Sequence, residues 1–199
     1  MPRLGLLPSL RPMMRFWQVA AMFCALVLFL RAEEPGPVFV WDAPKVVTSV
    51  FSQEVGMLDS ERDEYATNLA VYASNSLLAA KASDASLLMA RRVLALALQL
   101  SPRNRRAVVV NFQLSQGMLP ELIESNYSPQ VRARLLVTGG KLLDKQGGGE
   151  NKRLARYFIQ LAAEMDPKNE DAVYASEVQR LDHGALDWSL VTDPKEENP

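Results

Sequence analysis

Between residues 60 and 181, apolar residues recur every three or four positions, which is the spacing of one face of an α-helix. Capping residues, prolines and glycines divide this stretch into six expected helices, over residues 60–80, 83–100, 104–116, 131–145, 154–165 and 170–181. The helix over residues 154–165 has the clearest apolar face. No stretch shows a convincing ladder of strands, so the sequence predicts an all-α fold.

Two shorter segments have weaker patterns. Asp42 is placed to cap a helix over residues 42–55, with Pro44 in its first turn. Residues 120–125 are expected to form one short helix, and residues 38–41 are expected to pack as an extended arm.

The chain begins with a different kind of segment. Residues 16–30 form an apolar run in which Gln18 is the only polar residue, and the charged residues ahead of it are all basic. This pattern is typical of a secretory signal, with Ala32 before a candidate cleavage point. The alternative is an uncleaved hydrophobic helix that anchors the chain, with Arg15 and Arg31 at the two membrane interfaces. Either form predicts a cell-envelope protein, anchored in the inner membrane and facing the periplasm, or periplasmic or secreted after cleavage.

The sequence repeats itself at an offset of 65 residues without gaps. Residues 100–108 align with residues 165–173, and in both stretches two residues separate a Pro-x-Asn turn from an Ala-Val pair. The same offset also pairs Leu77-Leu78 with Leu142-Leu143, Ala90-Arg91 with Ala155-Arg156, and Ala97 with Ala162. Small residues at such positions let two helices approach closely, so the repeat predicts two similar helical units.

The repeated pattern Ala-x6-Ala-x4-Pro-x-Asn resembles the second helix and closing turn of a tetratricopeptide (TPR) repeat. It is carried first by Ala90, Ala97, Pro102 and Asn104, and then by Ala155, Ala162, Pro167 and Asn169. The resemblance covers about residues 61–182 and implies a short TPR-like α-solenoid of antiparallel helix pairs, preceded by the N-terminal hydrophobic helix. A generic helical bundle is the alternative fold.

The resemblance also implies a function without chemistry, which is the binding of a protein partner on a concave groove. The groove residues that it implies lie on the first helix of each pair: Asn68, Asn75, Arg132 and Lys141. The alternative is a structural or assembly subunit of an envelope complex that has no peptide groove. Because the array is short, dimerisation or docking on a larger complex is also expected.

Arginines cluster where the helix over residues 104–116 begins. Arg103, Arg105 and Arg106 flank this N-terminus, and Arg91 and Arg92 lie on the preceding helix. Backbone N–H groups at a helix start favour anions, and arginines strengthen that preference. The cluster is therefore a candidate site for an acidic segment of a partner.

Composition narrows the function further. The formal net charge of −1 divides into +4 over residues 1–32 and −5 over the rest, which argues against a nucleic-acid binder. One Cys and one His leave no set of residues for a disulfide framework or a multi-histidine metal site. His183 follows a helix end, and the Gly147-Gly148-Gly149 run lacks the Gly-Lys-Ser/Thr of a phosphate loop. The sequence therefore predicts no enzymatic activity, no metal and no cofactor.

The expected organisation has four parts. Residues 1–32 are the signal or anchor, 33–60 a linker with an N-terminal arm or helix, 61–182 the repeat domain, and 183–199 an acidic tail. The tail is expected to be flexible. The alternative is that it folds back, with Trp188 in the repeat groove, or docks a partner.

Overall fold

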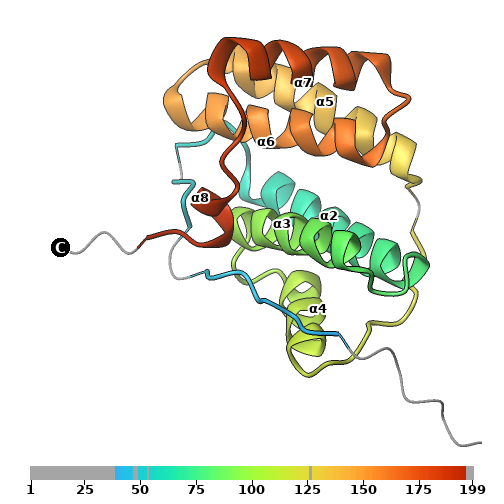
Figure 1. The fold of residues 1–199 in the computed structure, drawn as a ribbon. Helices are drawn as coiled ribbons and strands as arrows, with labels where there is room; N and C mark the ends of the chain where they lie inside the picture. The colour runs from blue at the N-terminus through green and yellow to red at the C-terminus, as the bar shows by residue number, and fades with distance from the viewer. Residues whose placement is uncertain (1–38, 47–48, 53, 126, 196–199) are drawn as a thin grey trace, which may run out of the picture. The chain divides into compact units, whose positions relative to one another are not determined.

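The structure, a computed structural model, describes residues 39–46, 49–52, 54–125 and 127–195. Over these residues it contains α-helices and no strand, which confirms the predicted all-α class (Figure 1). The helices are α2 (Asp59–Ala79), α3 (Asp84–Leu100), α4 (Arg105–Ser115), α5 (Pro129–Gln146), α6 (Gly149–Met165), α7 (Glu170–His183) and α8 (Ser189–Thr192). The signal or anchor expected over residues 16–30 lies outside the described residues. Within the described part, no helix has the length and hydropathy needed to cross a bilayer.

Local signals set the helix boundaries. The Asn104 side chain accepts a hydrogen bond from the Ala107 N–H at the start of α4, and Asn169 does the same for the Ala172 N–H at the start of α7. Pro129 occupies the first turn of α5, where its missing N–H costs nothing. The six helices predicted between residues 60 and 181 are therefore confirmed, with ends that differ by a few residues.

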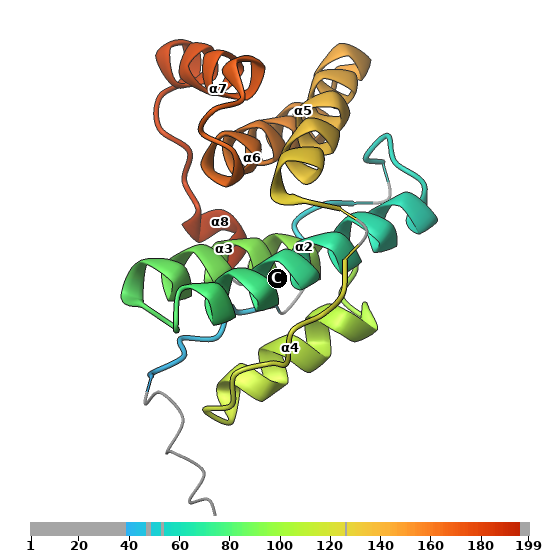
Figure 2. The ribbon, with the colours of Figure 1, turned by 90° about the vertical axis from the view of Figure 1, so that its right-hand side faces the viewer.

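The sequence repeat corresponds to two three-helix units. Adding 65 to the bounds of α3 gives residues 149–165, which are the bounds of α6, and the start of α4 maps in the same way on the start of α7. In the first unit α2 packs against α3 and α4, and in the second α5 packs against α6, which also contacts α7. Two views at right angles place α4 on the side of α2 and α3 opposite to α5–α7 (Figures 1 and 2).

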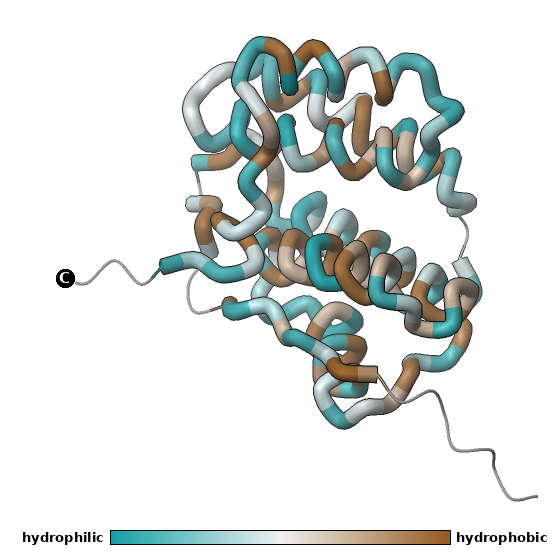
Figure 3. The backbone as a smooth tube through the Cα atoms, in the orientation of Figure 1, coloured by the Kyte–Doolittle hydropathy of each residue, from teal (hydrophilic) through white to brown (hydrophobic). Residues whose placement is uncertain are grey.

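Small residues lie where the helices approach most closely. Ala97 of α3 and Ala162 of α6 are both 0% exposed at equivalent positions. A Cβ added to Gly140 of α5 would lie only 2.8 Å from the Ile159 Cγ1 atom of α6. Hydrophobic positions run along α3 and α6 and also occur on α4 (Figure 3).

Aromatic side chains link the two units. Tyr65 of α2 stacks on Phe158 of α6 at a centroid distance of 4.8 Å. Tyr157 meets Phe51 edge-on at 6.3 Å and Trp188 at 5.0 Å. These rings come from the N-terminal arm, both units and the C-terminal segment, so aromatic packing helps to hold four parts of the chain together.

The helix expected over residues 42–55 is wrong for the described residues of that stretch, which form turns and extended chain. Long-range hydrogen bonds explain the difference. The buried Gln99 side chain of α3 accepts from the Val50 N–H at 2.9 Å, and the Ser49 hydroxyl donates to the Gln99 carbonyl at 2.6 Å. The arm thus satisfies its polar groups on α3 instead of within a helix.

The short helix expected over residues 120–125 is also wrong, because that segment is irregular. Its backbone pairs with a side chain of α2. The Asn75 amide donates to the Ile123 carbonyl at 2.8 Å and accepts from the Ile123 N–H at 3.0 Å. This two-way pairing imitates the pairing of an adjacent strand and holds the segment extended along α2.

The C-terminal segment folds back over the first unit. The Tyr157 hydroxyl donates to the Asp187 carbonyl at 2.7 Å, and the Gln99 amide donates to the Val191 carbonyl at 3.2 Å. The Lys45 N–H of the arm donates to the Thr192 carbonyl at 2.8 Å. Residues 184–195 therefore belong to the compact unit Pro37–Pro199, and the flexible tail expected from residue 183 is wrong for them.

At acidic pH the C-terminal segment, residues 184–195, is expected to detach from the helices. Arg91 holds both carboxylate oxygens of Asp193, at 3.0 and 2.9 Å, and this hydrogen bonding lowers the pKa of Asp193 below its ordinary value of 3.8. A lowered folded-state pKa stabilises the fold above the unfolded pKa, and the contribution is lost as the pH falls through the folded value. We therefore expect Trp188 to become exposed below about pH 4.

Trp188 emission, taken as the difference between the protein and its Trp188→Phe variant, measures this release as a shift to longer wavelength. Asp193→Asn should show the shifted emission already at neutral pH, whereas Asp182→Asn, an exposed control, should not. Identical pH profiles for the protein and Asp193→Asn would contradict a role for this ion pair.

Candidate functional site

A cavity of about 240 Å³ lies between the first helices of the two units, α2 and α5. We call it the α2–α5 cavity. Its apolar floor contains Leu69 and Leu136, and polar groups of Asn68 and Arg132 line it as well. It thus combines apolar area with a few polar side chains, as ligand sites commonly do.

Arg132 is the unusual group in this cavity. It is only 4% exposed, its Nε atom is buried with no hydrogen-bond partner, and within the described residues it has no ion pair. One of its terminal nitrogens donates to the Ser125 hydroxyl, and its guanidinium lies 5.8 Å from the Tyr72 ring centroid. Burial lowers the pKa of Arg132. A buried cation that lacks most of its acceptors costs free energy, which an acceptor from outside can recover.

Tyr65 fixes one wall of the cavity. Its hydroxyl donates to the Leu135 carbonyl at 3.3 Å, and burial raises the pKa of this phenol. Gly139 of α5 leaves room for this side chain, since a Cβ there would lie 2.5 Å from the Tyr65 hydroxyl. The exposed carboxylates Glu61 and Glu64 stand at the rim, so the entrance is acidic while the interior is basic.

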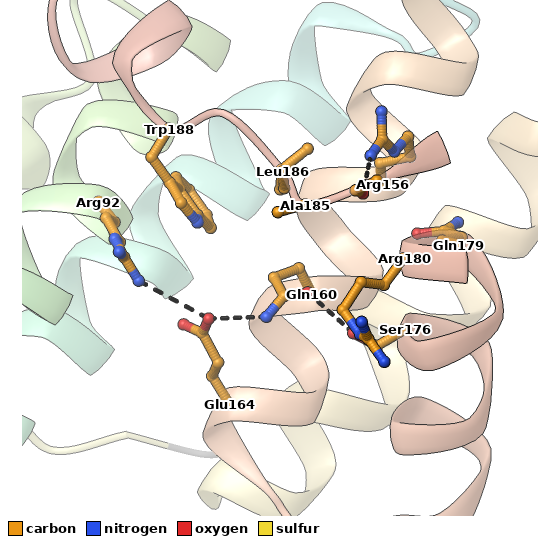
Figure 4. A pocket seen from close by; sticks show the side chains of 11 residues that line it. Arg92, Arg156, Gln160, Glu164, Ser176, Gln179, Arg180, Ala185, Leu186 and Trp188 are labelled. Carbon is orange, nitrogen blue, oxygen red and sulfur yellow. Dashed lines mark hydrogen bonds and ion pairs between the residues drawn. The ribbon is translucent and has the colours of Figure 1, made fainter. Parts of the chain in front are cut away.

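A second cavity, of about 210 Å³, lies between α3, α6, α7 and residues 184–188 (Figure 4). Its polar side chains form one chain of contacts. Arg92 lies 3.8 Å from Glu164, which accepts from Gln160 at 2.9 Å, and Gln160 accepts from Ser176 at 2.8 Å. Arg92 also lies 5.4 Å from the Trp188 ring centroid. These side chains are hydrogen-bonded or ion-paired to one another, so we assign this cavity a structural role. We take the α2–α5 cavity as the candidate site.

The structure places the predicted site residues in several different locations. Asn68 and Arg132 line the α2–α5 cavity. Asn75 is paired with the Ile123 backbone through one N–H and through its carbonyl oxygen. Lys141 is exposed elsewhere on α5, with its Nζ 4.0 Å from an Asp171 carboxylate oxygen. These four residues therefore do not form one groove.

Arg103, Arg105 and Arg106 lie exposed at the start of α4, away from this cavity. Arg105 and Arg106 border a shallow recess that they share with Asp63 of α2. The expected continuation of this cluster on the preceding helix is wrong, because Arg91 pairs with Asp42 and Asp193, and Arg92 with Glu164. The basic cluster is therefore limited to α4 and its start.

Sequence reasoning missed the aromatic partners of the site. Tyr65 and Tyr72 lie seven positions apart, and their spacing alone indicates only that they share one face of a helix. The one signal for a site was the polar Asn68, which lies on the same helix face between the two tyrosines. Only the fold brings Arg132 of α5 close to them. His183 is exposed at the end of α7, and Gly147 and Gly148 form the turn between α5 and α6, as the sequence predicts.

In the described part of the chain, no three His, Cys, Asp or Glu side chains lie close enough to hold a metal ion. Comparisons with known proteins give no further assignment, because no family model, no curated protein and no solved structure matches the chain.

Proposed function

We propose that the protein is a non-enzymatic interaction scaffold that binds a segment of a partner protein in the α2–α5 cavity. The observation that carries this proposal is the buried Arg132, whose Nε has no partner inside the chain. An apolar side chain of the partner would cover Leu69 and Leu136, and a carboxylate or carbonyl oxygen would accept from Arg132. The free protein would thus hold a binding group in place at a cost in its own stability.

The proposed framework is a short TPR-like solenoid. Support comes from α3 and α6, which have the same length of 17 residues and bury equivalent alanines at their packing faces. Further support comes from Asn104 and Asn169, which cap equivalent helices after equivalent prolines. In such an array the first helices of successive pairs would line the groove, and α2 and α5 would be those helices.

The proposed location is the cell envelope, where residues 16–30 would act as a signal or as an anchor. A second candidate function is a structural subunit of an envelope complex without a peptide groove. It is favoured by Asn75, which hydrogen-bonds the Ile123 backbone of its own chain in both directions, and by the polar side chains of the second cavity, which hydrogen-bond one another.

A photo-cross-linking experiment tests the groove. Benzoylphenylalanine at position 68 is expected to capture one partner of defined mass in the cells that produce the protein. Arg132→Met should reduce the yield at least about ten-fold, because a hydrogen bond to a charged group contributes about 1.5–3 kcal/mol. The fold should be preserved, since methionine fills a similar volume.

Arg134→Met is the matched control, because Arg134 is exposed two residues further along α5. It should leave the yield unchanged. Capture that is equally strong in both variants would show that Arg132 does not hold the partner. Absence of any product from position 68 would favour the structural subunit.

A further inference from the structure

The outer face of α4 exposes large apolar side chains. Val108 and Val109 are 45% and 40% exposed, and Phe112 is 61% exposed. The opposite face of the same helix buries Ala107, Val110 and Leu114 against the unit. An 11-residue helix with an apolar core face therefore also has apolar residues on its solvent face, which needs an explanation.

Arginines border this face and no acid lies within it. Residues 101–120 contain Arg103, Arg105 and Arg106 and no Asp or Glu, so this segment carries a charge of +3. None of the three forms an ion pair among the described residues, and the acid that shares their recess is Asp63 of α2. Basic side chains around exposed Val and Phe are the pattern of a helix that lies in a membrane interface.

The position of α4 suits such a contact. It lies on the side of α2 and α3 that is opposite to α5–α7 (Figures 1 and 2). The Trp41 indole of the arm donates to Asn111 of α4 at 3.0 Å, so the arm runs beside this helix. Exposed Val40, Met118 and Leu122 add apolar area in the arm and in the segment that follows α4.

The arm also leads to the apolar run over residues 16–30. Only residues 31–38 separate that run from Phe39, and eight residues reach at most about 29 Å. If the run sits in a bilayer, this short tether raises the effective concentration of the helical domain, and with it of α4, at the lipid surface.

We propose that the outer face of α4, formed by Arg103, Arg105, Arg106, Val108, Val109 and Phe112, docks on a bilayer that contains anionic lipids. The inference uses the proposed membrane location of residues 16–30 and is independent of the α2–α5 cavity. A second copy of the chain fits less well, because residues 101–120 offer no Asp or Glu to pair with the arginines of another copy. Each arginine near an anionic surface contributes about five-fold to affinity.

The test uses the full chain with Cys24→Ser and a single new cysteine, Gln116→Cys, which carries an environment-sensitive fluorophore. Gln116 is exposed one turn beyond Phe112 on the same side of α4. The protein is reconstituted in vesicles of phosphatidylcholine alone, or of phosphatidylcholine and phosphatidylglycerol at about 7:3, with brominated acyl chains as quencher. We expect at least two-fold quenching in the anionic vesicles and less in the neutral ones.

Two comparisons make the result decisive. The same probe at position 174, on the exposed Tyr174 of α7, should not be quenched. Replacing Arg103, Arg105 and Arg106 together by Gln should reduce quenching at position 116 to the level of position 174. Equal quenching at both positions, or quenching that ignores lipid charge and the arginines, overturns the proposal. A blue shift without lipid quenching, together with a cross-linked dimer, also overturns it and assigns the surface to a second copy.

Discussion

Replacing Ala162 with glutamate is expected to unfold most of the protein at room temperature. Ala162 is 0% exposed and packs inside the second three-helix unit, so an ionised carboxylate there would lose its hydration without a partner. The longer side chain would also overfill a tight helix contact, at a cost of about 1–3 kcal/mol. Together these penalties approach the total stability of an ordinary domain, about 5–15 kcal/mol.

Circular dichroism with urea titration measures this effect. Ala97→Glu, at the equivalent position of α3, should behave in the same way, because Ala97 is also 0% exposed. Ala85→Glu is the control, since Ala85 is exposed in the first turn of α3, where an acid interacts favourably with the helix dipole. Folding of Ala162→Glu with an unchanged urea midpoint would contradict the close packing of α6.

The helices of the two units were predictable because their signals are local. Asn104 and Asn169 accept hydrogen bonds from N–H groups three residues later, and the prolines before them act on their own neighbours. The sequence repeat also predicted that α3 and α6 are equivalent helices, since an offset of 65 residues relates their bounds. These features need no knowledge of distant contacts.

The arm and the segment after α4 were not predictable for the opposite reason. The Val50 N–H finds its acceptor in Gln99, 49 residues away, and the Ile123 backbone finds both its partners in Asn75, 48 residues away. Each segment has local helix signals. In the folded protein, however, its backbone bonds a distant side chain instead of forming the hydrogen bonds of a helix. A single sequence carries no record of such pairs.

Only part of the candidate site was predictable from the sequence, because distant contacts decide which side chains stay available for a partner. Asn68 and Asn75 lie two helical turns apart on α2, and the resemblance to a TPR repeat implies that both belong to one groove. In the structure Asn75 hydrogen-bonds the backbone of Ile123, whereas Asn68 lines the α2–α5 cavity. Whether a polar side chain is free depends on what folds back over it, and helix periodicity does not contain that information.

The two buried arginines show how burial alone fails to describe a residue. Arg62 and Arg132 are both 4% exposed. Arg62 donates from Nε to the Leu100 carbonyl at 3.1 Å and from its terminal nitrogens to the Ser52 and Phe51 carbonyls, at 3.0 and 3.2 Å. It thus joins the C-terminus of α3 to the arm, whereas Arg132 has one hydrogen-bond partner and an unpartnered Nε.

Arg62→Met is therefore expected to destabilise the protein by about 3 kcal/mol, because it removes three hydrogen bonds and leaves the Leu100 carbonyl of α3 without its Arg62 donor. For a folded unit of this size the melting temperature should fall by roughly 10 °C. Arg132→Met should change it by only a few degrees, since the free protein gains little from that guanidinium. Arg180→Met, at an exposed position of α7, controls for the loss of one positive charge. Thermal unfolding followed by circular dichroism ranks the three variants, and equal losses for Arg62→Met and Arg132→Met would mean that the carbonyl contacts of Arg62 do not hold the arm to α3.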